Sequence, residues 1–149
     1  TCLQWNGIAV VYLERAKQTM VDYRTLIGRQ WEYGKFDCFT LIRDWFGLQG
    51  IELPDFERPA DLQTCESIFL KQALAIGFEQ VNYAKRRPGD VLIMCLGTAA
   101  PMHAAILLPD ERILHQRQDS LSAVEPLGRY YVSRVAAVFR YAADRKVAG

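Results

Sequence analysis

The sequence predicts an α+β fold in which amino-terminal helices pack on an antiparallel β-sheet. Apolar residues in the first half of the chain recur at spacings of three and four residues, which is typical of helices. The second half instead has short apolar runs bounded by turn residues, which is typical of strands. The connections between these runs are too short for crossover helices, so we expect antiparallel pairing. Helices followed by strands favour the α+β class over a doubly wound sheet.

Three helices are expected, over Ile8–Ile27, Cys38–Phe46 and Leu62–Ile76. Gly28 is suited to end the first of them, because glycine adopts the backbone conformation that follows many helices. Asp61 is suited to cap the third, because its carboxylate can accept from free N–H groups of the first turn. These helices are expected to present one apolar face each to the sheet.

Five strands are expected in the second half, separated by turns rich in proline and glycine. Asp90 belongs to a Pro-Gly-Asp turn, and we expect it to begin a strand rather than to take part in catalysis. The expected strands cover Phe78–Tyr83, Asp90–Leu96, His103–Leu108, Arg112–Gln116 and Tyr131–Tyr141.

The size and charge of the chain narrow its class. Its 149 residues fit a single domain, which we expect to span residues 1–149. The 18 Lys and Arg residues nearly balance 17 Asp and Glu residues, so no nucleic-acid partner is predicted. No apolar run approaches the roughly 20 residues of a membrane span. The four cysteines form no C-x-x-C pair, which favours free thiols in a reducing compartment over a disulfide framework or a zinc site.

Cys38 is expected at the start of the second helix, directly after the potential capping residue Asp37. The positive end of the helix dipole lies there, so we expect the pKa of the thiol to be lowered and the thiolate to be favoured. A nucleophilic cysteine needs such a position. A lone cysteine is nevertheless more often a small buried apolar residue, so the position alone decides nothing.

The chain has two histidines, and both fall at strand positions. His103 begins one expected strand and His115 ends the next, with a tight turn over residues 109–111 between the strands. A hairpin would make the two histidines cross-strand neighbours. One ring could then take a proton from a thiol while the other orients it. Either histidine alone is more simply a surface or core residue, and only their joint pattern favours catalysis.

The ordered motifs Asp37-Cys38, Pro88-Gly89-Asp90, His103-Ala-Ala-Ile and Ile-Leu-His115 resemble those of the NlpC superfamily of cell-wall cysteine peptidases. The resemblance spans roughly residues 31–116. It implies a papain-like fold with Cys38 as nucleophile, His103 as base and His115 as the third catalytic residue. Further segments, such as Tyr-Gly-Lys-Phe-Asp-Cys-Phe at residues 33–39, resemble the NlpC-type domain of tail-tip assembly proteins from long-tailed bacteriophages.

The resemblance also implies a substrate, partners and a location. The substrate would be an amide bond in the peptidoglycan stem peptide, hydrolysed without a metal or cofactor. The partners would be other phage tail-tip proteins, met in the host cytoplasm during assembly and then at the virion tail tip. Trp31 stands where many family members have a tyrosine near the oxyanion site, so Trp31 and Asp37 are assigned to the oxyanion and substrate cleft. Ala105 stands where glycine is usual.

Two other classes of function remain open. The peptidase fold could serve mainly as an assembly surface in a tail-tip or hub component, with aromatic residues of the carboxy-terminal half at the contacts. The same scaffold could also perform different thiol chemistry, such as acyl transfer or hydrolysis of an amide outside the cell wall.

Overall fold

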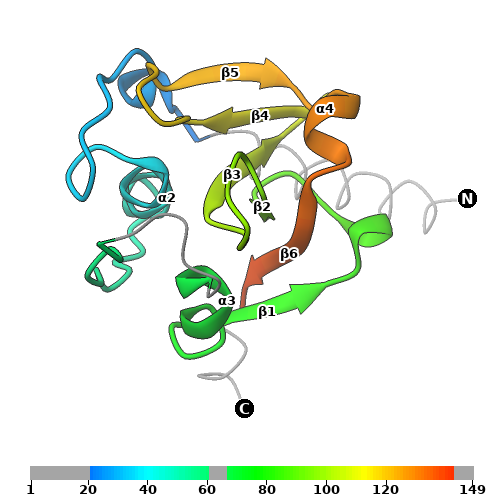
Figure 1. Cartoon of the computed structure of the whole chain (residues 1–149). Helices are drawn as coiled ribbons and strands as arrows, with labels where there is room; N and C mark the ends of the chain where they lie inside the picture. Colours follow the sequence, from blue (N-terminus) through cyan, green and yellow to red (C-terminus); the bar gives the residue numbers. More distant parts are fainter. Residues whose placement is uncertain (1–20, 61–66, 143–149) are drawn as a thin grey trace, which may run out of the picture.

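The computed structural model describes residues 21–60 and 67–142, which form one antiparallel six-stranded sheet with short helices around it (Figure 1). The strands lie in the order β1-β6-β2-β3-β4-β5, and every neighbouring pair is antiparallel. Strands β2 and β3 are central and fully buried. The strand bounds are Phe78–Val81 (β1), Val91–Met94 (β2), His103–Leu108 (β3), Arg112–His115 (β4), Ala123–Pro126 (β5) and Val135–Tyr141 (β6).

The helices are short apart from α2, which packs against β3. Figure 1 shows α2 and α3 on the same side of the molecule and α4 near the far ends of β4 and β5. No helix among the described residues is long and apolar enough to cross a membrane. The helical segments are η1 (Arg24–Leu26), α2 (Cys38–Gly47), α3 (Ile68–Gln72), η2 (Tyr83–Lys85) and α4 (Arg129–Val132).

The sheet has an apolar core on each face, because successive strand residues point to opposite sides. On the face covered by α2, the sheet residues Ile93, Ile106 and Phe139 pack with helix residues such as Leu41. On the other face, a second cluster contains Leu92 and its strand neighbours together with residues that follow β5 and lie in α4. Both faces are therefore covered, which explains why the central strands have continuous rather than alternating apolar residues.

The α+β class, the second helix and all five expected strands are confirmed, with changes at their ends. Strand β3 has the predicted bounds, and α2 extends one residue beyond the prediction, to Gly47. The first expected strand is shorter because Asn82 caps a 3-10 turn: its side chain accepts from the N–H of Ala84 at 2.9 Å.

Other expectations are wrong. The helix expected to reach Ile27 is only the 3-10 turn η1 within the described residues, and its earlier part lies outside them. The helix expected over residues 62–76 is α3 alone within the described part; Ser67 caps it by accepting from the N–H of Leu70 at 3.3 Å, and turns follow from Ala73. The expected cap Asp61 lies outside the described residues. The last expected strand begins as the helix α4, and β5 was not expected at all.

Candidate active site

Asp37 sets the start of α2 and thereby the position of Cys38, its first residue. The Asp37 Oδ1 accepts from the backbone N–H of Thr40 at 2.9 Å, which satisfies a free donor of the first turn. The Asp37 Oδ2 accepts from the backbone N–H of Gly34 at 2.9 Å and so ties the preceding loop to the helix. The capping role expected for Asp37 is therefore confirmed, and it fixes the start of the helix, where the thiol of Cys38 lies.

Arg58 holds Asp37 from the other side. Its guanidinium donates from Nε to Oδ2 at 2.8 Å and from Nη2 to Oδ1 at 3.1 Å, and both side chains are buried, with exposures of 9% and 6%. Burial raises the pKa of Asp37, but the bonds from Arg58, Thr40 and Gly34 outweigh it and hold that pKa below its ordinary value. Nothing in the sequence pattern indicates this role, because Arg58 lies in an irregular segment between two prolines.

A cleft of about 360 Å³ opens beside the start of α2. The predicted site residues Cys38, His103, Trp31 and Asp37 all line it. The Sγ of Cys38 donates to the carbonyl of Met102 at 3.7 Å, so the thiol lies next to the residue that precedes His103. Within the described chain, no hydrogen bond joins the thiol to the His103 ring. The remaining lining residues are Tyr33, Phe39, Arg58, Pro59, Phe69, Leu96, Gly97, Thr98, Met102, Gln116, Arg117, Gln118, Ser120 and Tyr130.

The two histidines are brought into direct contact by the β3–β4 hairpin. The turn between the strands is short because Asp110 and Glu111 adopt left-handed backbone conformations, with φ of 64° and 52°. The register places Ala105 opposite His115, so His103 is the diagonal neighbour of His115. The His103 Nε2 lies 2.9 Å from the His115 Nδ1. The contact expected from the hairpin is therefore confirmed.

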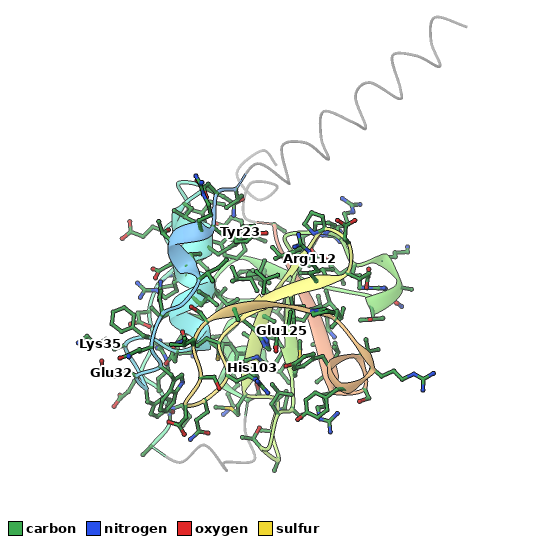
Figure 2. The ribbon with its side chains drawn as sticks, turned by 90° about the horizontal axis from the view of Figure 1, so that it is seen from above. Tyr23, Glu32, Lys35, His103, Arg112 and Glu125 are labelled. Carbon is green, nitrogen blue, oxygen red and sulfur yellow. The ribbon has the colours of Figure 1, made fainter. Side chains whose placement is uncertain are left out.

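The hydrogen bonds continue beyond the histidine pair to Glu125 and Tyr131. The His115 Nε2 lies 2.5 Å from the Glu125 Oε2. The Tyr131 hydroxyl donates to the same Oε2 at 2.6 Å. Figure 2 shows the labelled side chains of His103 and Glu125 close together, as this chain of contacts requires. Glu125 and Tyr131 were not expected at the site. Glu125 lies on the unexpected strand β5, and Tyr131 lies on α4, in a segment whose sequence is typical of a strand.

Burial controls the ionisation of the thiol and of the adjacent histidine. Burial and, to a smaller extent, the carboxylate of Asp37 together raise the pKa of Cys38 to about 12. Burial and, to a smaller extent, repulsion from His115 and Arg117 together lower the pKa of His103 to about 3. The expectation that the helix start lowers the pKa of Cys38 is wrong, because loss of hydration outweighs the partial charge of the helix. At neutral pH the two groups are a neutral thiol and a neutral imidazole.

Trp31 stands on the wall of the cleft, stacked against Tyr33 with ring centroids 6.0 Å apart. The Tyr33 hydroxyl donates to the carbonyl of Pro59 at 2.5 Å, which anchors this aromatic wall. The placement of Trp31 agrees with the cleft position expected for it. Its role toward an oxyanion stays a prediction.

The other cysteine that the structure describes, Cys95, is a free thiol like Cys38 and does not line the cleft. Within residues 21–60 and 67–142, no group of three or more His, Cys, Asp or Glu side chains could hold a metal ion. The cleft therefore brings together a cysteine thiol and a histidine that is in contact with a second histidine.

The class of protein follows from this fold and from comparison with known families. The chain belongs to the NlpC/P60 family, whose model matches residues 28–140. Among solved structures, it is similar to an NLP/P60-family protein from Staphylococcus aureus, described as similar to lipoprotein, with a TM-score of 0.59 and 22% identity over 87% of this chain and 42% of that one. It is also similar to the peptidoglycan hydrolase RipB of Mycobacterium tuberculosis, with a TM-score of 0.59 and 18% identity over 86% of this chain and 65% of that one. At these identities the likeness concerns the fold.

More specific relatives are phage proteins. The chain is 39% identical over 121 residues to the tail tip assembly protein K of Escherichia phage lambda, which covers 80% of this chain and 61% of that protein. It is 30% identical over 120 residues to the protein of the same name from Escherichia phage N15, covering 78% of this chain and 49% of that protein. The chain thus spans about half to three fifths of the length of these relatives.

Proposed function

We propose that this chain is a cysteine peptidase that hydrolyses an amide bond in the peptidoglycan stem peptide. The observation that carries the proposal is the arrangement in one cleft of the Cys38 thiol, at the start of α2, and the buried His103 ring, which is bonded to His115. Membership of the NlpC/P60 family and the likeness to a peptidoglycan hydrolase support this substrate class.

In the proposed reaction, the Cys38 sulfur attacks the amide carbonyl carbon while its proton passes to the free Nδ1 of His103. The backbone N–H of Cys38, at the helix start, faces the developing oxyanion, with Trp31 on the adjacent wall. The proton on His103 then moves to the leaving nitrogen as the C–N bond breaks, which leaves a thioester. Water attacks the thioester and gives a proton to His103, which returns it to sulfur as the acid leaves.

The neutral resting pair fits this scheme. Because burial disfavours the charged form of both groups, the thiolate forms only when the proton moves within the pair. His115 orients His103 throughout, through the contact between its Nδ1 and the His103 Nε2, which lie 2.9 Å apart. A reagent that reaches the cleft therefore meets a thiol whose reactivity depends on His103.

The test is mass spectrometry of defined muropeptides incubated with the wild-type chain and with Cys38→Ser. We expect the wild type to release a stem-peptide fragment and the variant to lose at least about a thousandfold in rate, because a nucleophile knockout removes the whole covalent route. Cys95→Ser is the matched control, since this free thiol lies outside the cleft. Continued digestion by the Cys38 variant would contradict the assignment. A new amide or ester in the products would indicate acyl transfer in place of hydrolysis.

The tail-tip relatives favour a second candidate function, in which the chain acts as an assembly component of a phage tail tip. We place it in the host cytoplasm during assembly and then in the virion, beside other tail-tip proteins. Phage tails assembled with Cys38→Ser separate the two functions. Normal particles with normal infectivity would indicate assembly alone, and normal particles with impaired DNA delivery would indicate that hydrolysis is needed at the cell wall.

A further inference from the structure

The hydrogen-bond chain that begins at His103 does not end at His115. His115 and Tyr131 both contact one oxygen, the Oε2 of Glu125, at 2.5 and 2.6 Å. The His115 side chain is 1% exposed, and the Glu125 side chain is 34% exposed. The buried imidazole of His115 is thus joined to the carboxylate of Glu125 at the edge of the sheet. Tyr131, from α4, fixes the Glu125 oxygen that His115 contacts.

One arrangement of hydrogens satisfies all the contacts of this hydrogen-bond chain. The hydrogen bond from Tyr131 holds the pKa of Glu125 below its ordinary value, although burial opposes this, so Glu125 is a carboxylate that can only accept. The His115 Nε2 must then carry the hydrogen. Burial lowers the pKa of His115, so its ring is neutral at pH 7 and its Nδ1 is a bare acceptor.

The same reasoning applies to His103, the proposed base. A bare His115 Nδ1 at 2.9 Å requires the His103 Nε2 to carry its hydrogen. His103 is neutral, so its Nδ1 is then free to accept a proton from Cys38. One carboxylate therefore sets the tautomer of two rings in series.

We propose that Glu125 is a positioning residue that fixes His115 and, through it, His103 in the tautomer that leaves the His103 Nδ1 free to accept a proton. Tyr131 holds the acceptor oxygen in place. This inference deepens the proposed cysteine-hydrolase function and rests on it for its catalytic meaning. The charge of Arg117 acts on both histidines and on Glu125.

The two substitutions at Glu125 separate the acceptor from its charge. In Glu125→Gln, the amide oxygen can take the place of Oε2 and accept from both His115 and Tyr131, so the tautomers are kept. In Glu125→Ala, the His115 Nε2 loses its acceptor, and the ring is free to move its hydrogen to Nδ1. The exposed carboxylate of Glu52 does not line the cleft, so Glu52→Ala is the matched control.

Tyr131 adds a second, independent test. Tyr131→Phe keeps the ring in the apolar cluster on the far face of the sheet and removes only the hydroxyl. Alone, it leaves the carboxylate as acceptor. In the double variant Glu125→Gln/Tyr131→Phe, nothing keeps the amide oxygen rather than the amide nitrogen toward His115. We therefore expect the double variant to lose the tautomer although neither single variant does.

The measurement is ¹⁵N–¹H correlation of the imidazole nitrogens, which distinguishes the tautomers directly. The chain has two histidines, so a His115→Asn spectrum assigns both rings. We expect the Nε2–H form for both rings in the wild type, Glu125→Gln and Glu52→Ala. We expect a mixture in Glu125→Ala and in the double variant. Retained Nε2–H forms in Glu125→Ala would overturn the proposal.

The second readout is the rate at which iodoacetamide alkylates Cys38 at neutral pH, corrected with Cys38→Ser for the other three cysteines. We expect Glu125→Ala to slow alkylation and muropeptide cleavage by between about 10- and 100-fold, less than the ten-thousandfold typical of losing the residue that orients a catalytic histidine directly. The effect should fall on kcat rather than KM. Equal losses in Glu125→Gln and Glu125→Ala would overturn the tautomer argument. Neither the spectra nor the alkylation needs a substrate, so they test Glu125 even if muropeptides are not cleaved.

Discussion

Replacement of Asp37 should destabilise the fold strongly, because this carboxylate both caps α2 and pairs with the buried Arg58. Asp37→Ala removes an N-cap, which costs about 1 kcal/mol. It also leaves the buried Arg58 without its main partner, and breaking a buried ion pair costs about 3–5 kcal/mol. Arg58 keeps a bond to the half-exposed Asp55 at 2.7 Å, which places the total near the lower end of the combined range, at about 4 kcal/mol.

Asp37→Asn separates the contribution of the helix cap from that of the ion pair with Arg58. The amide oxygen can still cap the helix, but the amide nitrogen that replaces Oδ2 cannot accept from Gly34 or from the Arg58 Nε, so the loss is that of the charge and of these two bonds, about 2–3 kcal/mol. Urea unfolding followed by tryptophan fluorescence is the assay, because Trp45 lies in α2 and is 3% exposed. Asp22→Ala, which removes a fully exposed ion pair with Arg24, is the control and should leave the unfolding midpoint unchanged. Equal losses from the alanine and asparagine variants, or no loss from either, would refute the reasoning.

The same asparagine substitution should have the opposite effect on the thiol. Burial is the main cause of the raised pKa of Cys38, and the negative charge of Asp37 is the second cause. The positive charge of Arg58 lowers this pKa. Removing the carboxylate while keeping the guanidinium should lower the pKa of Cys38 and speed its alkylation. A variant that is less stable yet more reactive would separate the structural role of Asp37 from its electrostatic one, and slower alkylation would contradict the predicted sign.

Two further predictions concern pH and the Pro-Gly-Asp turn. His103 has an ordinary pKa of 6.5 and a folded pKa of about 3, so below pH 6.5 the unfolded chain binds a proton that the folded chain does not. Stability should therefore fall as pH drops from 6.5 toward 3, by up to about 1.4 kcal/mol per pH unit for this group; His103→Gln should show a smaller slope between pH 6.5 and 4.5, and an unchanged slope would contradict the burial effect. Asp90 is 2% exposed and accepts from Arg140 at 2.8 Å, so Asp90→Ala should cost about 3 kcal/mol in urea unfolding. At low urea it should leave Cys38 alkylation unchanged, and slower alkylation would indicate a role in the site.

The sequence was sufficient to find the residues that stand on regular elements. Cys38 follows a capping residue at the start of an amphipathic helix, and the two histidines occupy strand positions around a short turn, so local pattern and spacing predict where each lies. The histidine contact needs only a hairpin register, which is a short-range property of the chain.

The rest depends on distant partners that no local pattern encodes. Arg58 comes from an irregular segment and is identified only by its bonds to Asp37, 21 positions away. Glu125 lies on a short, half-exposed strand that ends at Pro126, and proline is a signal against strands. The pKa of Cys38 was expected in the wrong direction for the same reason: a helix start is visible in the sequence, whereas the burial that outweighs it is a property of the assembled cleft.

The strand order has a consequence for how the protein is made. Strands β1 and β2 are not paired with each other; β6 lies between them, and it follows β2 by some forty positions in the sequence. Until β6 has left the ribosome, β1 lacks its partner strand and β2 exposes a free edge, which is a template for aggregation. Pairing of such remote segments also slows folding. A nascent chain that still lacks residues 135–141 thus has open edges at β1 and β2, and we expect it to depend on chaperones until that segment has been synthesised.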